Sequence, residues 1–116
     1  MQIRKSNTNK IVLSTLRMQK LVEVQEISYC EAEGSCTKIV LLDGVEFTST
    51  KPLKEIEKKL KEHSFFRINR SQLVNMDAVK EIHKKRNTTI TLKNEKALII
   101  SHRKIPQFNQ FIKLMY

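Results

Sequence analysis

The stretch Phe65–Asn75, which reads FFRINRSQLVN, places hydrogen-bonding side chains between apolar anchors. Arginine and asparagine form paired hydrogen bonds with guanine and adenine edges, and serine bonds to phosphates or bases. None of these side chains makes an obvious catalytic group, so the stretch indicates recognition rather than catalysis. The residues expected to contact nucleic acid here are Arg67, Asn69, Arg70 and Ser71.

Both arginines of this stretch also have structural alternatives. Arg70 is the strongest candidate for reading a base, and its alternative role is an ion pair with Asp77 or Glu81. Arg67 alternates in phase with Asn69, so both side chains could face the same side of a strand. A phosphate contact and a structural bond to the backbone both remain open for Arg67.

A second candidate group follows the last apolar run of the chain. Arg103 stands there with Ser101 and His102 beside it, and its alternative is a solvated strand end. Local turns offer a competing role for small polar residues, because Ser and Asn side chains often bond to nearby backbone groups. That alternative applies to Ser71 and Asn75, and for Asn75 we favour it.

The sharpest basic cluster is the run Lys84, Lys85 and Arg86. Such a run is often only a solvated turn, but it can also supply phosphate contacts and a salt-dependent affinity. Lys38 is a similar candidate for a phosphate contact.

The charge balance favours a polyanionic partner. The 116 residues include 22 Lys and Arg against 12 Asp and Glu, a net charge of +10. Nucleic acid is the first candidate partner, an acidic membrane surface is the second, and plain solubility is the unspecific alternative. With 40% hydrophobic and 29% charged residues, the chain reads as one folded domain with one core.

Several function classes lack their signals. With two glycines, the chain has no glycine-rich phosphate loop, and it shows neither a nucleophile–histidine order nor paired carboxylates in an apolar run. The three histidines have no second ligand at the spacing of a metal site, so we expect no bound metal. The missing catalytic signals likewise lead us to expect no enzymatic activity and no cofactor. Cys30 and Cys36 suit reduced residues of a cytoplasmic protein. Neither a signal peptide nor a membrane span is expected.

Short strands dominate the predicted structure. Alternation, β-branched residues and turn signals such as Gly34 and Asp43-Gly44 predict nine strands, and Ser71–Val74 is either a tenth or a single helical turn. The nine are Ile11–Leu16, Lys20–Val24, Ile27–Ala32, Thr37–Leu42, Val45–Ser49, Phe65–Ile68, Val79–His83, Thr88–Leu92 and Ala97–Ile100.

Two helices complete the prediction. Leu53, Ile56 and Leu60 recur at helical spacing, which predicts a helix over Leu53–Glu62, capped by Thr50. The tail Lys104–Tyr116 has a similar apolar spacing, and Pro106 fits its first turn. Residues 1–10 read as a flexible lead, and residues 11–116 as one mainly β domain.

In this order, the segments resemble the LytTR family of bacterial DNA-binding domains. The resemblance rests on Ile27–Ala32, Asp43-Gly44, the helix Pro52–Leu60, the block Phe65–Asn75 and the closing Ile100–Arg103, and it covers nearly the whole chain from about Ile11. The family usually has His before the Arg-Ser pair, where this chain has Asn69.

The resemblance implies an elongated fold of several sheets whose loops enter successive major grooves of DNA. It implies contacts from Ser35, Cys36 and Lys38, from Asn69 and Arg70, and from Ser101, His102 and Arg103. Family members commonly act as output domains of two-component response regulators and bind direct repeats in promoters. The implied partners are promoter DNA, a second copy on that DNA, and a sensor kinase pathway if the domain belongs to a longer regulator.

The alternative function is an RNA-binding or general polyanion-binding β module. RNA modules display exposed aromatic side chains on which bases stack. Here the aromatic residues stand in apolar company and are expected in the core: Phe65, Phe66, Phe108 and Phe111, with Tyr29 as the ambiguous one.

Overall fold

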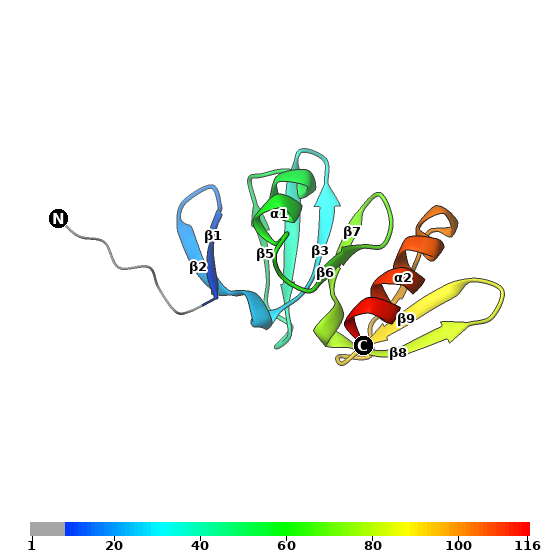
Figure 1. The fold of residues 1–116 in the computed structure, drawn as a ribbon. Coiled ribbons are helices and arrows are strands. Elements are labelled where there is room, and N and C mark those ends of the chain that lie inside the picture. The colour runs from blue at the N-terminus through cyan, green and yellow to red at the C-terminus, as the bar shows by residue number, and fades with distance from the viewer. Residues whose placement is uncertain (1–8) are drawn as a thin grey trace.

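Three antiparallel sheets and two α-helices form an elongated body in the computed structural model, which describes residues 9–116 (Figure 1). Its principal extents are 55 × 30 × 25 Å. The strands are β1 (Lys10–Ser14), β2 (Gln19–Glu23), β3 (Ile27–Glu33), β4 (Cys36–Leu41), β5 (Glu46–Ser49), β6 (Phe65–Arg67), β7 (Gln72–Asn75), β8 (Val79–Lys84), β9 (Thr88–Leu92) and β10 (Ala97–Ile99). The helices are α1 (Leu53–Lys59) and α2 (Ile105–Met115). This confirms the predicted fold: mainly β, elongated, with one mid-chain and one C-terminal helix.

A five-stranded sheet of order β5-β4-β3-β7-β6 lies in the middle of the molecule. The hairpin β1-β2 lies at one end, and the three-stranded sheet β10-β9-β8 lies with α2 at the other (Figure 1). The undecided segment Ser71–Val74 is therefore a strand, shifted by one residue to Gln72–Asn75. It pairs with β3 on one side and β6 on the other, so it joins the edge strand β6 to the rest of the sheet.

Both faces of this sheet are buried, each by a different core. Cys30 packs with the β1-β2 hairpin and α1, whereas its neighbour Tyr29 packs with the three-stranded sheet and α2. Successive strand residues point to opposite faces, so adjacent positions supply separate clusters. The expectation of a single core is therefore wrong, because the central sheet is covered on two sides.

Helix α1 is shorter than predicted and has a different start. It ends at Lys59 because the following turns tighten to three-residue spacing, with the Lys61 N–H donating to the Lys58 carbonyl. Pro52, not Thr50, is the N-cap residue, and no side chain caps the helix. The Thr50 hydroxyl donates instead to the Ser14 carbonyl at the end of β1.

The predicted turns lie where expected, and other strand ends differ by one or two residues. Gly34 (φ +62°) and Gly44 (φ +92°) adopt the left-handed conformation that glycine accommodates without strain. The predicted lead of residues 1–10 falls mostly on residues 1–8, which lie outside the described residues. Asn9 accepts a hydrogen bond from the Val24 N–H, and Lys10 begins β1.

Candidate nucleic-acid interface

The loop between β6 and β7 is held by the side chain of Arg67. The Arg67 guanidinium donates to the Asn69 carbonyl at 3.0 Å and to the Arg70 carbonyl, and it pairs with the Glu57 carboxylate at 2.9 Å. The Ile68 N–H donates to the Gln72 carbonyl, which closes the loop. Of the two roles open for Arg67, the structure shows the backbone bond.

Both polar atoms of the Asn69 side chain make hydrogen bonds within the protein. Its Oδ1 accepts from the Ser71 N–H at 2.9 Å, and its Nδ2 donates to Gln72 Oε1 at 2.9 Å and to the Ile99 carbonyl at 3.0 Å. An asparagine amide has two N–H donors, and both are used here. Asn69 therefore shapes the loop, and its direct base contact stays a prediction.

Arg70 projects from this shaped loop into solvent. Its side chain is exposed, and no carboxylate of residues 9–116 lies within ion-pairing distance of it. Neither alternative partner is paired with it: Asp77 accepts instead from the Tyr116 hydroxyl at 2.9 Å, and the Glu81 carboxylate lies 3.4 Å from the His83 ring. The guanidinium is thus available to an external acceptor.

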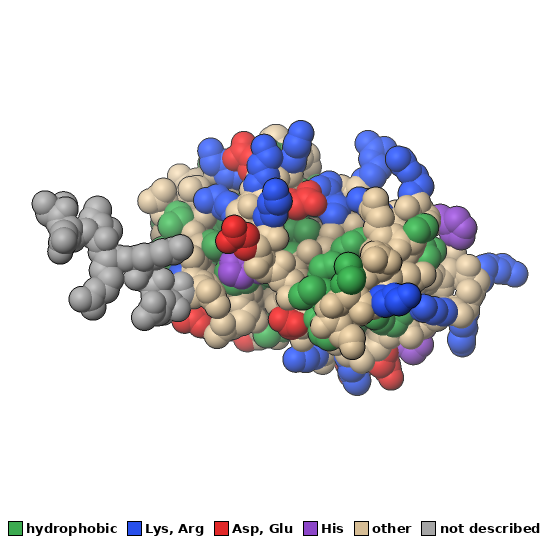
Figure 2. All heavy atoms as spheres, viewed as in Figure 1, with side chains coloured by type: hydrophobic (Ala, Val, Ile, Leu, Met, Phe, Trp, Pro, Cys, Tyr) green, Lys and Arg blue, Asp and Glu red, His purple; other side chains and the backbone are tan. Residues whose placement is uncertain are grey.

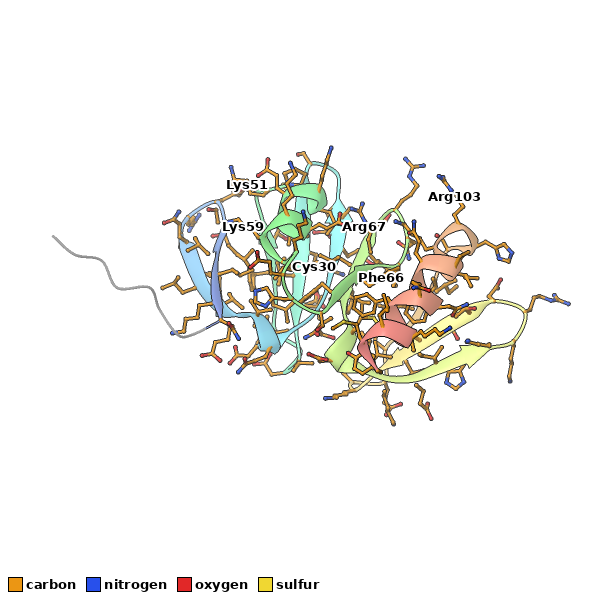
Figure 3. The ribbon with its side chains drawn as sticks, in the orientation of Figure 1. Cys30, Lys51, Lys59, Phe66, Arg67 and Arg103 are labelled. Carbon is orange, nitrogen blue, oxygen red and sulfur yellow. The ribbon has the colours of Figure 1, made fainter. Side chains whose placement is uncertain are left out.

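The second candidate group lies directly beside this loop. Ser101 N–H donates to the Ile68 carbonyl at 2.9 Å, which ties the segment before α2 to the β6–β7 loop. His102 and Arg103 follow in a 3-10 turn, and both side chains are exposed. Figure 3 shows Arg103 pointing away from the body of the molecule, and it has no ion-pair partner among the described residues.

A cleft of about 470 Å³ lies at this junction, and it brings residues of the β6–β7 loop together with residues more than thirty positions further along the chain. Predicted residues form most of its lining, and Lys104, Gln107 and Glu57 are additions that the sequence did not reveal. Its lining residues are Glu57, Arg67, Asn69, Arg70, Ser101, Arg103, Lys104 and Gln107. Lys104 and Gln107 reach the cleft from the start of α2, and Glu57 reaches it from α1.

The turn between β3 and β4 carries the remaining predicted group. Ser35 is exposed, Cys36 is partly exposed, and Lys38 pairs with Glu31 at 3.2 Å. This pairing raises the pKa of Lys38, and the pKa of Glu31 is lowered, first by a hydrogen bond from Gln72 and further by Lys38. Lys38 is therefore charged, and its ammonium group already has one partner, the Glu31 carboxylate.

These three segments project from one edge of the molecule. In Figure 1, the β3–β4 turn, the β6–β7 loop and the turn before α2 all lie along its upper side. Figure 2 shows Lys and Arg side chains gathered along the same side, with acidic side chains interspersed near α1. Basic side chains thus lie on the same side of the molecule as the predicted contact loops.

The basic run Lys84, Lys85 and Arg86 lies at a different place, on the β8–β9 hairpin. All three side chains are exposed, and none has a carboxylate partner within residues 9–116. This hairpin extends to the end of the body that lies opposite β1-β2 (Figure 1). The run is therefore separate from the cleft but free to meet a polyanion.

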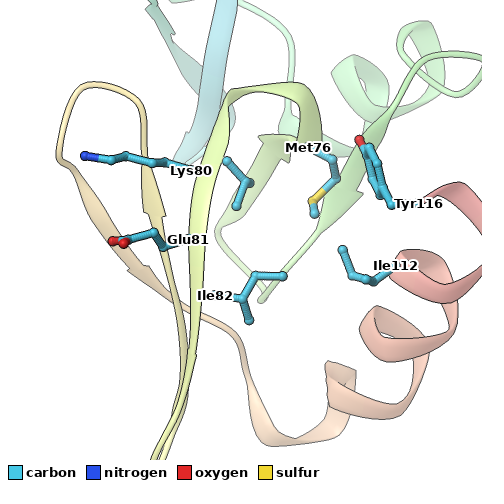
Figure 4. Close-up of a pocket in the computed structure, with 7 residues that line it drawn as sticks. Met76, Lys80, Glu81, Ile82, Ile112 and Tyr116 are labelled. Atoms are coloured by element: carbon cyan, nitrogen blue, oxygen red, sulfur yellow. The ribbon is translucent and has the colours of Figure 1, made fainter.

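A second hollow, of about 260 Å³, lies between β8 and the C-terminal turn of α2 (Figure 4). Met76, Val79, Ile82 and Ile112 give it a mostly apolar wall. Lys80 at its rim is paired with Glu95 at 2.7 Å. None of the predicted contact residues lines it.

Other kinds of site find no support in the part of the chain that the structure describes. No three His, Cys, Asp or Glu side chains of residues 9–116 are grouped so that they could hold a metal ion. Among the described helices, none has the length and apolar character needed to cross a membrane. Both cysteines are free thiols, with Cys30 buried and Cys36 partly exposed.

Comparison with known families decides the assignment. The family model for the LytTr DNA-binding domain matches residues 17–113, which is most of the chain. This chain belongs to the LytTR family. The resemblance inferred from the sequence is thereby confirmed, and membership makes this a DNA-binding domain of the transcription-regulating class.

Two individual proteins show how far the likeness extends. The LytTR domain is 33% identical over 81 residues to the sensory transduction protein LytT of Oceanobacillus iheyensis, a match that covers 70% of this chain. The chain spans about a third of that relative's length (33%). A solved LytTr DNA-binding domain of a Bacillus cereus response regulator shares the fold at a TM-score of 0.76 with 22% identity, covering 91% of this chain and 98% of that one.

Proposed function

We propose that this LytTR domain binds double-stranded DNA sequence-specifically and regulates transcription, with its loops entering the major groove. The observation that carries the proposal is the pair Arg70 and Arg103. Both guanidinium groups are exposed and lack carboxylate partners among the described residues, and both line one cleft whose walls are hydrogen-bonded to each other. Arginine is the side chain that most often reads guanine in the major groove.

The shape of the molecule supports contacts with more than one groove. The body is 55 Å long, whereas one turn of B-DNA spans about 34 Å. The three loops lie along one edge of this length (Figure 1). A body of this length, with its contact loops on one edge, suits binding along one side of the duplex, where successive major grooves face the protein.

The remaining predicted residues fit a supporting role at the phosphates. Lys84, Lys85 and Arg86 are exposed cations at the end of the body, and Lys38 flanks the β3–β4 turn. Shorter polar side chains on or beside the three loops would add further contacts: Ser35, Cys36, Ser71, Ser101 and His102. The phosphate contacts would supply salt-dependent affinity, and the two arginines would supply sequence preference.

The relatives suggest the setting in which the domain works. Because the LytT relative is a sensory transduction protein about three times as long as the match, we assign this domain the output role in a response regulator addressed by a sensor kinase. Two copies would occupy direct repeats in a promoter. Reduced thiols at Cys30 and Cys36 suit the cytoplasm, where such DNA lies.

A randomised duplex pool, selected for binding at physiological salt and then sequenced, tests this proposal. We expect an enriched motif that recurs in direct orientation. A pool that stays random while binding remains salt-sensitive would contradict sequence-specific recognition and leave general polyanion binding. Selection from an RNA pool in parallel separates the RNA alternative, which the burial of Tyr29 disfavours because it leaves no stacking platform there.

A further inference from the structure

A continuous chain of polar contacts joins the three loops of the interface. Lys38 pairs with the Glu31 carboxylate at 3.2 Å, and Gln72 Nε2 donates to the same carboxylate at 2.7 Å. Asn69 Nδ2 then donates to Gln72 Oε1 at 2.9 Å and to the Ile99 carbonyl at 3.0 Å. The chain therefore runs from the β3–β4 hairpin, through the β6–β7 loop, to the segment before α2.

The register of the central sheet places this chain at the end of a ladder. Glu31 lies opposite Lys38 on β4 and opposite Gln72 on β7, so the three side chains form a row across three strands. The pair Glu31–Gln72 is the last paired position between β3 and β7, and beyond it one further backbone bond joins Ala32 to Ser71. Side-chain bonds at this point act directly on the relative placement of the loops.

Gln72 occupies the middle of the row, and both ends of its amide are used. Its Nε2 faces a carboxylate and its Oε1 faces an N–H donor, so this orientation of the amide satisfies both neighbours and the reverse one would satisfy neither. The bond to Glu31 lowers the pKa of that carboxyl, which keeps it charged and makes the bond charge-assisted. Glutamine is thus chemically required as a donor on one side and an acceptor on the other.

We propose that Gln72 is a positioning residue for DNA recognition, which sets the spacing of the β3–β4 turn and the β6–β7 loop without reading a base itself. The inference rests on the proposed function. Base readout depends on placing several side chains at base edges simultaneously, so a loop that shifts relative to its neighbour loses discrimination before it loses phosphate attraction. A role in stability alone would instead change specific and random binding in parallel.

The test compares Gln72→Glu with the double exchange Glu31→Gln/Gln72→Glu. The single change places two carboxylates together, whereas the exchange restores one donor and one acceptor between the strands and leaves the net charge unaltered. Gln110→Glu, on the exposed side of α2, is the matched control because it adds the same charge away from the loops. Affinities for the selected site and for random duplex are measured alongside thermal unfolding of each variant.

We expect Gln72→Glu to lower the specific-to-random affinity ratio about tenfold, and the exchange to restore most of it. Gln110→Glu should weaken both affinities equally. Parallel losses in Gln72→Glu, or a lost ratio that the exchange does not restore, would overturn the positioning role. Should Gln72→Glu fail to fold, Gln72→Met gives the same readout without added charge. Wild-type protein without any site preference would instead refute the proposed function itself.

Discussion

The side-chain amide of Asn69 donates a hydrogen bond to the carbonyl oxygen of Ile99, thirty residues further along the chain, at 3.0 Å. Together with the bond from the Ser101 N–H to the Ile68 carbonyl, this contact fixes the β6–β7 loop against the segment that carries Arg103. The two segments that carry Arg70 and Arg103, which both line the cleft, are therefore joined to each other by hydrogen bonds. A family position that usually holds His is filled here by a residue with two donors on one nitrogen.

Replacing Asn69 with Asp should loosen this loop pair. Aspartate keeps the acceptor for the Ser71 N–H but loses both donors, which leaves the Ile99 carbonyl and Gln72 Oε1 without their partner. We expect a loss of about 1 kcal/mol in the free energy of unfolding in urea and a lower specific-to-random affinity ratio. Asn109→Asp, on exposed α2, makes the same chemical change and should do neither. Unchanged binding in the Asn69 variant would show that the amide bond does not shape the interface.

Replacing Lys85 with Ala should weaken specific and random binding equally. Lys85 is exposed on the β8–β9 hairpin, away from the cleft, so its contribution is to phosphate attraction. The slope of log affinity against log salt should become shallower by about one unit. Titrations of one duplex at several salt concentrations measure that slope. A slope equal to that of the wild type would mean that this hairpin does not reach the phosphate backbone of the DNA.

Asn75 offers a test of the fold that does not involve DNA. Its Nδ2 donates to the Ile27 carbonyl at 2.9 Å, its Oδ1 accepts from the Asp77 N–H at 2.9 Å, and the residue is buried. Replacement with Ala should lower the free energy of unfolding by about 1–3 kcal/mol, because both backbone groups lose their partner. Asn87→Ala, exposed in the β8–β9 turn, should change it by less than about 0.5 kcal/mol. Equal urea midpoints for the two variants would contradict the buried role.

The two thiols should differ sharply in reactivity. Burial raises the pKa of Cys30 from about 9 to about 12, whereas Cys36 is partly exposed. Because the folded state holds this proton more tightly than the unfolded state, its contribution to stability is complete below pH 9 and declines as the pH rises towards 12. At pH 8, a disulfide reagent should label one thiol quickly and the second only on unfolding. Cys36→Ser should abolish the fast phase, and rapid labelling that persisted in this variant would show Cys30 to be accessible.

Much of the fold follows from local patterns. Alternating apolar residues locate the strands, and turn residues such as Gly34 and Asp43-Gly44 locate the reversals, because both signals act within a few residues. The division into three sheets and two cores does not follow from them. It depends on which faces meet, as when Cys30 and Tyr29 supply opposite sides of β3. The end of α1 at Lys59 likewise depends on how the chain must turn into β6.

Part of the candidate interface follows from the sequence in the same way, and part of it depends on the fold. Residue types in Phe65–Asn75 indicate the chemistry, and the structure brings Arg70 and Arg103 to one cleft. A backbone bond is one of the two roles predicted for Arg67, and the structure shows it. The ion pair of Arg67 with Glu57 and the bond of Asn69 to Ile99 could not be read from the sequence, because these partners lie on other elements. The role of Gln72 does not follow from the sequence for the same reason, since its bond to Glu31 joins residues 41 positions apart.

The central claim is most directly tested by the affinity of Arg70→Ala for the selected DNA site and for random duplex at one salt concentration. Lys93→Ala is the control, since it removes one exposed charge from the β9–β10 turn, outside the cleft. We predict that Arg70→Ala loses about 1–3 kcal/mol on the selected site and little on random DNA, while Lys93→Ala preserves the ratio of the two affinities. An unchanged ratio in Arg70→Ala would contradict base reading by this loop.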